Sequence, residues 1–131
     1  MSKTKVFSPI QAAAGSFLGG PLASTIFISQ NFSALNESEK KSTTLIAGAI
    51  IIFALIVISL NLPDNFPGFI FTIATIVATR LMVEKKQFTK EKIEESEQLT
   101  FHSNWLVFGI GVLSLLLTFA VVFVIIMALE I

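Results

Sequence analysis

The chain has 131 residues, of which 53% are apolar and only 14% are charged, and its mean hydropathy is +0.81. A soluble domain carries about a quarter charged residues, so this composition excludes an ordinary soluble fold. We expect an all-α integral membrane protein in which residues 1–131 form a single domain. The absence of cysteine excludes disulfides and thiolate metal sites. We expect no metal, no cofactor and no nucleic-acid partner.

The first apolar segment, residues 10–32, is interrupted by the stretch "GSFLGGPLAS". Two glycines followed by a proline break a helix strongly, and each flanking half is long enough for only about half of a hydrocarbon core of ~30 Å. The sequence therefore predicts a re-entrant helical hairpin that turns at Gly19, Gly20 and Pro21. A kinked full span with the N-terminus outside remains the alternative.

The distribution of basic residues favours the hairpin. If residues 10–32 crossed the bilayer, the nine lysines and arginines would be divided two against seven between its sides. If the segment re-enters, all nine lie on one side, which the positive-inside bias places in the cytoplasm. We expect a cytoplasmic N-terminus and a periplasmic or extracellular C-terminus.

Small residues recur through this segment at helical spacing, among them Ser16 and Ser24, and Gly15–Gly19 forms a GxxxG pair. A re-entrant turn must be buried in protein or face a water-filled cavity, because its backbone groups are unsatisfied in lipid. Small residues allow another helix to approach closely enough to bury it. Packing is the favoured interpretation, with a polar permeation pathway as the alternative.

The same stretch resembles a group of small, poorly characterised bacterial inner-membrane proteins with an N-terminal pattern F-S-P-x-Q, then an aromatic residue and G-G-P-x-A, then asparagine. The matching residues are Phe7, Ser8, Pro9, Gln11, Phe17, Gly19, Gly20, Pro21, Ala23 and Asn31. The resemblance covers less than a quarter of the chain. It implies a bacterial inner-membrane location and no particular activity.

Two further apolar segments, residues 44–62 and 66–83, are separated by the turn sequence "NLPDNFPG". We expect them to form antiparallel transmembrane helices. The second carries a stripe of small hydroxyl residues and one charge, Arg80, close to its end. The candidate residues for helix packing or a polar pathway are therefore Ser16, Ser24, Thr72, Thr75, Thr79 and Arg80.

Residues 84–103 are rich in charge and predict a cytoplasmic loop before the last transmembrane helix at 104–129. A helical extension of the preceding segment and a solvated linker are the two alternatives for this loop. Basic residues near a membrane surface attract anionic lipids. The candidate residues for lipid headgroups are Lys85, Lys86, Lys90 and Lys92. His102 is the only histidine, and we expect it to lie at the membrane interface rather than in a metal site, which needs several ligands.

No catalytic motif is present, and no histidine lies at membrane depth to activate a serine. The sequence therefore predicts a protein that is not an enzyme. The favoured function is that of an accessory or assembly subunit in contact with the bilayer, which acts through helix packing in a homo-oligomer or with other membrane subunits. The alternatives are a channel or transporter subunit whose hairpin lines a polar or anion pathway, and a holin-like permeabilising protein.

Overall fold

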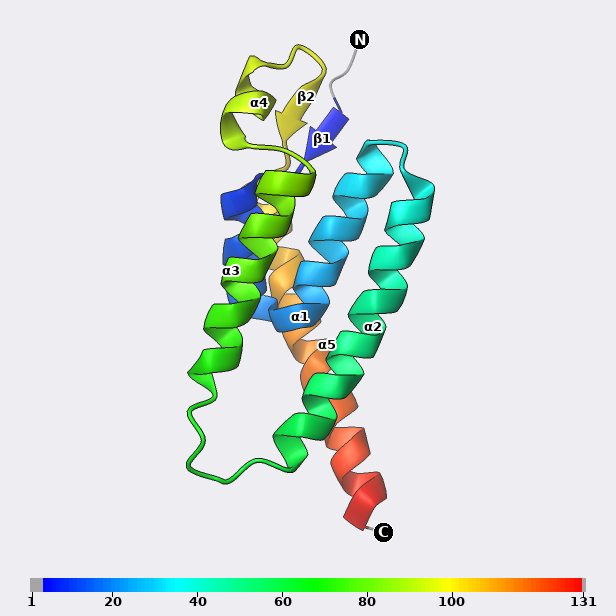
Figure 1. Ribbon diagram of the computed structural model, residues 1–131, viewed down its shortest axis with the longest axis vertical. Helices are drawn as coiled ribbons and strands as arrows, with labels where there is room; N and C mark the ends of the chain where they lie inside the picture. The colour runs from blue at the N-terminus through cyan, green and yellow to red at the C-terminus, as the bar shows by residue number, and fades with distance from the viewer. Residues whose placement is uncertain (1–3, 131) are drawn as a thin grey trace.

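The computed structural model describes residues 4–130, and its elements run β1, α1, α2, α3, α4, β2 and α5 along the chain (Figure 1). Their bounds are β1 Thr4–Val6, α1 Pro9–Ala34, α2 Ser38–Leu60, α3 Phe69–Lys86, α4 Lys90–Glu95, β2 Leu99–Phe101 and α5 Asn104–Glu130. The fold is mainly helical, as composition predicts.

Helix α1 is not continuous, because its backbone breaks at Gly20 with φ 71° and ψ −158°. This region of backbone space is open essentially only to glycine. Pro21 follows in the first turn of the second half, where its missing N–H removes no helical hydrogen bond. The chain therefore reverses direction in the middle of α1, and Figure 1 shows both of its ends on the same side of the molecule.

Contacts between the two halves of α1 establish the reversal. In a straight helix, residues 24 positions apart would be separated by ~36 Å. Here the backbone N–H of Phe7 donates to Asn31 Oδ1 at 2.8 Å, and the rings of Phe7 and Phe27 meet edge to face at 4.8 Å. Gly15 lies directly against the Phe27 ring, and a methyl group at this glycine would overlap that ring. The two halves thus form a tightly packed helical hairpin.

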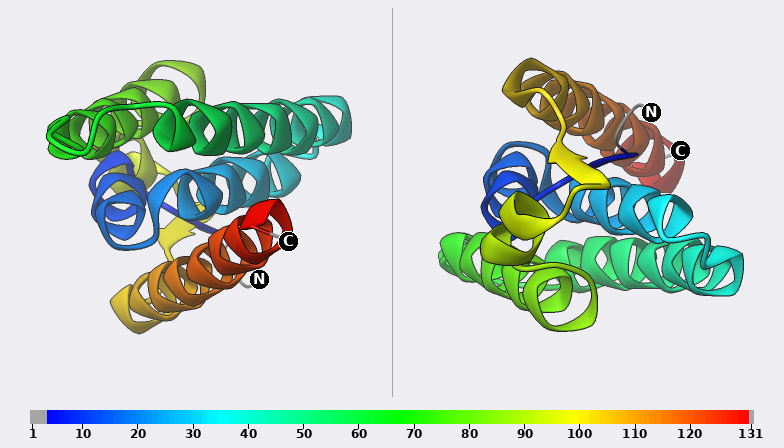
Figure 2. Two further views of the ribbon diagram at one scale, coloured as in Figure 1. Left: turned by 90° about the horizontal axis from the view of Figure 1, so that it is seen from below. Right: turned by 90° about the horizontal axis from the view of Figure 1, so that it is seen from above.

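The hairpin is the centre of the molecule. Helices α2, α3 and α5 each pack extensively against α1, and within residues 4–130 they make no comparably extensive contact with one another. The end views in Figure 2 show α1 between α5 on one side and α2 with α3 on the other. The core follows this arrangement, because most of its buried apolar residues belong to α1 (Ala12, Ala23, Phe27, Ile28 and Phe32).

Three described helices, α1, α2 and α5, are long and apolar enough to cross a membrane. α2 and α5 expose almost all of their side chains, as helices in lipid do. α1 meets the same criteria by length and composition, but its reversal shortens its reach to about half of its 26 residues. α3 carries four charges in its last two turns (Arg80, Glu84, Lys85 and Lys86). The chain is a helical membrane protein.

The segment expected as a charged loop has more structure than its sequence indicates. After α4, strand β2 pairs in parallel with β1, with Thr4 opposite Leu99 and Val6 opposite Phe101. Val6, Phe88 and Ile93 form a small apolar core beneath this pair. Strands of three residues are too short to show a periodic pattern, so the pairing of β1 with β2, here called the β ribbon, is not predictable from the sequence. The β ribbon and α4 cover the end of the bundle at which the hairpin opens (Figure 1).

Candidate functional site

Two buried amide side chains close the open end of the hairpin. Asn31, at 0% exposure, accepts the Phe7 N–H and donates from Nδ2 to the Phe7 carbonyl at 2.9 Å and to Gln87 Oε1 at 2.9 Å. Gln87 in turn donates from Nε2 to the Ile28 carbonyl at 2.9 Å. Every hydrogen-bonding group in this pair therefore has a partner, as buried polar groups require. Asn31 and Gln87 tie the N-terminal segment, the second half of α1 and the end of α3 together.

A second amide connects the hairpin to the last helix. Ser8 and Gln11 form a capping box at the start of α1, in which each side chain binds the other residue's backbone N–H. The Gln11 Nε2 also donates to the His102 carbonyl at 2.8 Å and to Asn104 Oδ1 at 3.0 Å. The beginning of α5 is thereby fixed against the beginning of α1. We refer to Gln11, Asn31 and Gln87 as the amide cluster.

His102 lies beside this cluster and stacks on the Phe7 ring at a centroid distance of 4.1 Å. Burial, and secondly the positive charge of Lys5, lower the pKa of His102 below its ordinary value of 6.5. Both effects favour the uncharged imidazole, and the ring packs against Phe7.

The turn of the hairpin is held by close helix approach. A methyl group at Gly19 would lie 2.7 Å from the Gly111 carbonyl oxygen and 2.9 Å from Ser114 Cβ, so a glycine is needed for α5 to reach the turn. Ser16 is 1% exposed and donates to the Ala12 carbonyl one turn back at 2.7 Å. Gly19 and Ser16, both candidates from the sequence, thus lie close to the reversal at Gly20 and contribute to helix packing there.

A cleft of about 320 Å³ lies between α2 and α3, and the second half of α1 forms its floor. Its lining is Pro21, Ser24, Thr25, Ile28, Thr43, Thr44, Ala47, Gly48, Ile51, Leu55, Thr75, Ala78, Thr79 and Met82. The Ser24 hydroxyl in the floor and the Thr79 hydroxyl in the α3 wall share a hydrogen bond of 2.6 Å, and Thr75 donates to the Phe71 carbonyl at 2.8 Å. The structure thus brings three of the predicted hydroxyl residues together on one surface.

A second cavity of about 240 Å³ lies beyond the turn of the hairpin. Pro21 and Leu22 form its roof, and its walls are apolar side chains of α2 with Phe71, Thr118 and Val122. We call it the lower cavity. This cavity lies where the hairpin ends, because α2 and α5 continue beyond the turn of the hairpin (Figure 1).

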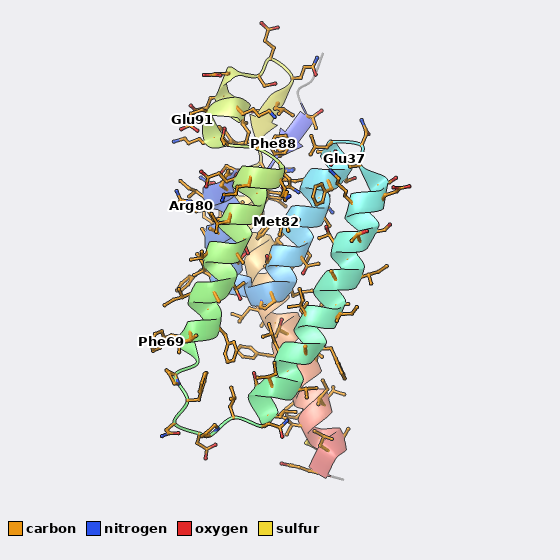
Figure 3. All side chains as sticks on the ribbon, in the orientation of Figure 1. Glu37, Phe69, Arg80, Met82, Phe88 and Glu91 are labelled. Atoms are coloured by element: carbon orange, nitrogen blue, oxygen red, sulfur yellow. The ribbon has the colours of Figure 1, made fainter. Side chains whose placement is uncertain are left out.

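The predicted charged residues are dispersed rather than gathered in one site. Arg80 is exposed, lies 3.9 Å from Glu84 and points away from α2 (Figure 3). Lys90 lies 3.9 Å from Glu94 on α4, while Lys85, Lys86 and Lys92 are exposed. Thr72 is half-buried, one turn before Thr75 on α3. The structure does not join Arg80 to the hydroxyl residues.

The amide cluster is not predicted from the sequence. In the sequence, Asn31 and Gln11 stand out only as parts of the N-terminal pattern, and Gln87 lies in the charged segment 84–103. The sequence does hold one indication of these residues: an amide side chain inside or beside an apolar segment needs hydrogen-bond partners within the fold. Its partners lie up to 93 positions away in the chain, so spacing could not identify them.

Comparisons with protein families, with curated proteins and with solved structures give no significant match to this chain.

Proposed function

We propose that α1 enters the membrane and returns to the same side as a re-entrant hairpin. The observation that carries this proposal is the pair of hydrogen bonds between Phe7 and Asn31, which brings both ends of α1 together. The two halves contain about 11 and 14 residues and reach ~17 and ~21 Å, short of a hydrocarbon core of ~30 Å. A kinked full span would have to break these contacts.

The charge distribution supports a cytoplasmic position for that end. Of the nine basic residues, Lys3 lies outside the described residues, and the other eight are in β1, the start of α2, the last two turns of α3, and α4. All of these parts lie at the end where the hairpin opens, whereas the loop between α2 and α3, which contains Asp64, and the end of α5, which contains Glu130, lie at the other (Figure 1). By the positive-inside bias, this distribution supports a cytoplasmic position for the N-terminal side. The resemblance of the N-terminal segment is the basis for proposing a bacterial inner membrane.

Cysteine labelling tests this topology. The chain contains no cysteine, so single cysteines at Thr4, Ser38, Asp64 and Glu130 can be labelled with a membrane-impermeant maleimide in inside-out and right-side-out vesicles. We expect Thr4 and Ser38 to react from the cytoplasmic side and Asp64 and Glu130 from the other. Reaction of Thr4 and Ser38 from opposite sides would contradict the hairpin.

We infer further that the protein is a non-enzymatic assembly subunit whose hairpin organises the other helices. Three observations support this role: α2, α3 and α5 all dock on α1, the Ser24 and Thr79 hydroxyls share a hydrogen bond where α3 meets α1, and the outward faces of α2 and α5 are apolar. Such faces suit lipid or the helices of a second copy or another subunit. The residues of the resemblance, apart from exposed Phe17, lie at the closure or turn of the hairpin, which supports reading that pattern as a hairpin signature.

Native mass spectrometry tests the assembly role. The protein is extracted from the membrane in polymer nanodiscs without detergent. We expect particles that contain more than one copy of the 14.3 kDa chain, or the chain with a second membrane protein. Particles that contain a single copy of this chain and no other protein would contradict the proposal.

The hydroxyl-lined cleft favours one second candidate, a transport pathway. Valine at Thr72, Thr75 and Thr79 separates the two functions. In liposomes, loss of potassium or chloride flux with an unchanged assembly would favour transport. A changed assembly, in a protein that carries no flux of either ion, would favour the packing role, because the Ser24–Thr79 hydrogen bond joins the hairpin to α3.

A further inference from the structure

We propose that the cleft between α2 and α3 binds one acyl chain of an anionic phospholipid, with its phosphate held by Lys40 and Lys86. The site goes beyond the assembly role and does not depend on it. Three features of the structure carry the inference: the shape of the cleft, the polarity of its lining from one end to the other, and the charges at its mouth.

The cleft runs along the helices. Its walls extend from Thr44 near the start of α2 to Leu55, and from Met82 on α3 down to Thr75, with Pro21 at its deep end. From Thr44 to Leu55 the α2 wall is about 16 Å long. An extended hydrocarbon chain can follow a wall of this length and bury its apolar surface against it.

Helical periodicity places one lysine on each wall at the cleft mouth. On α3, the lining residues Ala78 and Met82 are four positions apart, and Lys86 follows after four more. On α2, Thr44 lines the cleft, and Lys40 lies one turn before it, its carbonyl accepting from the Thr44 hydroxyl at 2.8 Å. Residues four apart share one face of a helix. Both lysines thus continue the cleft faces toward the cytoplasmic end.

The polarity of the cleft matches that of a phospholipid. Beneath the lysines lie the hydroxyls of Thr43 and Thr44, at the depth where ester groups follow the phosphate, and below them the lining includes Ala47, Ile51 and Leu55. This order of charged, hydroxyl and apolar side chains is complementary to a molecule with a phosphate and a hydrocarbon tail. The bilayer contains such molecules at high concentration. Each basic residue near a membrane surface contributes about 1 kcal/mol of attraction to anionic lipid.

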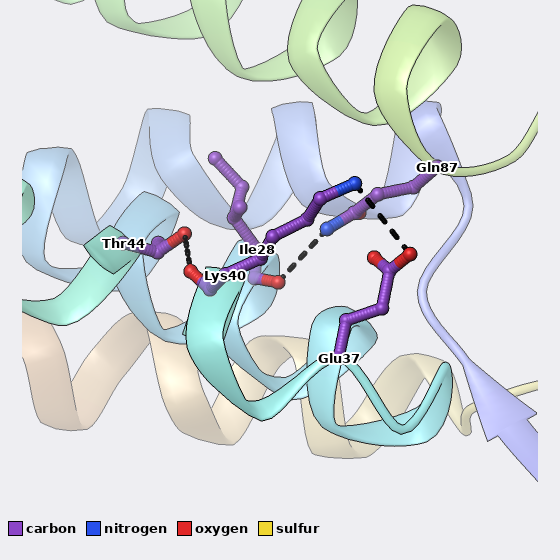
Figure 4. Close-up of polar contacts among 5 residues, drawn as sticks. All are labelled: Ile28, Glu37, Lys40, Thr44 and Gln87. Atoms are coloured by element: carbon purple, nitrogen blue, oxygen red, sulfur yellow. Dashed lines mark hydrogen bonds and ion pairs between the residues drawn. The ribbon is translucent and has the colours of Figure 1, made fainter. Parts of the chain in front are cut away.

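One carboxylate at the mouth opposes the anion. Glu37 Oε1 lies 3.5 Å from Lys40 Nζ (Figure 4), and both side chains are partly exposed, at 37% and 63%. An exposed ion pair of this kind is weak, so a phosphate can compete for Lys40. The same geometry predicts that the Glu37 charge lowers the affinity for anionic lipid.

The test is a lipid titration of the purified protein, in which bound phosphatidylglycerol and phosphatidylethanolamine are counted by native mass spectrometry. We expect one phosphatidylglycerol per chain, bound in preference to phosphatidylethanolamine. Lys40→Gln with Lys86→Gln should weaken phosphatidylglycerol binding about tenfold or more. Lys90→Gln with Lys92→Gln is the matched control. The sequence also named these two lysines as candidates for lipid headgroups, but they lie on α4, which contributes no residue to the cleft lining. The pair removes the same charge from the same end of the molecule and should leave binding in the cleft within twofold of the unmodified chain.

Three further variants test the position of the lipid and the effect of the charge at the cleft mouth. Ala78→Phe fills the cleft from an exposed position and should abolish binding of both lipids; Ala47→Phe does the same from the opposite wall if the first variant does not fold. Glu37→Gln should raise phosphatidylglycerol affinity. Equal losses in the two lysine pairs, unchanged binding in the phenylalanine variant, or no gain in Glu37→Gln would overturn the proposal. These readouts are taken per chain, so they are independent of the number of copies in the assembly.

Discussion

At the scale of single residues, a few buried polar side chains hold the hairpin closed, and their hydrogen-bonding groups have partners within the fold. Asn31 is the clearest case, because a single carboxamide satisfies both backbone groups of Phe7 and an oxygen of Gln87. Its two Nδ2 protons and its oxygen are all used. A side chain of this kind determines which part of the N-terminal segment meets the second half of α1.

Replacing Asn31 with alanine should destabilise the protein by several kcal/mol, because each buried polar group left without a partner costs about 1–3 kcal/mol. The measurement is the free energy of unfolding in detergent micelles titrated with a denaturing detergent. Asn65→Ala, at an exposed loop position, is the control and should change it by less than about 0.5 kcal/mol. Equal stability of the two variants would show that Asn31 does not close the hairpin.

His102 should make stability depend on pH. Its folded pKa is lowered by burial and by Lys5, so the unfolded chain binds a proton more readily. The contribution of His102 is therefore complete above its ordinary pKa of 6.5 and is lost as the pH falls below that value. The thermal midpoint should drop between pH 7.5 and 5.5, and His102→Gln should drop less. Parallel profiles for the two proteins would rule out this origin.

At the scale of elements, the turn of α1 depends on two adjacent glycines, each for a different reason. A methyl group at Gly20 would meet nothing within 4 Å, so the residue is not held by crowding. Only its φ of 71° requires glycine. Gly19, one position earlier, is the opposite case: it has an ordinary backbone and no free space.

Gly20→Ala should therefore cost about 1–3 kcal/mol in spite of the open space around it. Gly109 in α5 provides a matched control, since a methyl group there also meets nothing within 4 Å and its backbone is helical. Gly109→Ala should be neutral or stabilise the protein slightly, because alanine is the better helix former. Both values come from the same unfolding titration, and a neutral Gly20→Ala would mean that the reversal does not need this backbone angle.

Some of these elements can be predicted from the sequence and others cannot. Gly20 and Pro21 predict the break in α1, and hydropathy predicts α2 and α5, because each of these patterns lies within a short stretch of the chain. The extent of α2 differs, since it begins at Ser38 rather than at 44, with a charged first turn that hydropathy does not register. The β ribbon, the Gln87 contact and the cleft depend on residues far apart in the chain. No local pattern encodes them, so only the assembled structure reveals them.

At the scale of the whole molecule, the helices are arranged around one central element. α2 meets the hairpin where Gly48 lies directly against Thr25, and α5 meets it where Gly19 faces Gly111. Because α2 and α5 make no extensive contact with each other in the described part of the chain, each docks independently.

Gly19→Ala and Gly48→Ala should each destabilise the protein by about 1–3 kcal/mol through overpacking. The double variant should be additive within about 0.5 kcal/mol, because the two sites share no partner. A double-mutant cycle of unfolding free energies measures this. A coupling well above that value would mean that α2 and α5 support each other, contrary to the central role of α1.

The shortness of the hairpin has a consequence for the surrounding bilayer. In the proposed topology, the cytoplasmic leaflet contains the two arms of α1 as well as α2, α3 and α5, whereas the opposite leaflet contains none of the hairpin. The protein therefore displaces more lipid from one leaflet than from the other and has the form of a wedge. Many copies in one patch of membrane would expand one monolayer relative to its partner and bend it, with the cytoplasmic surface convex.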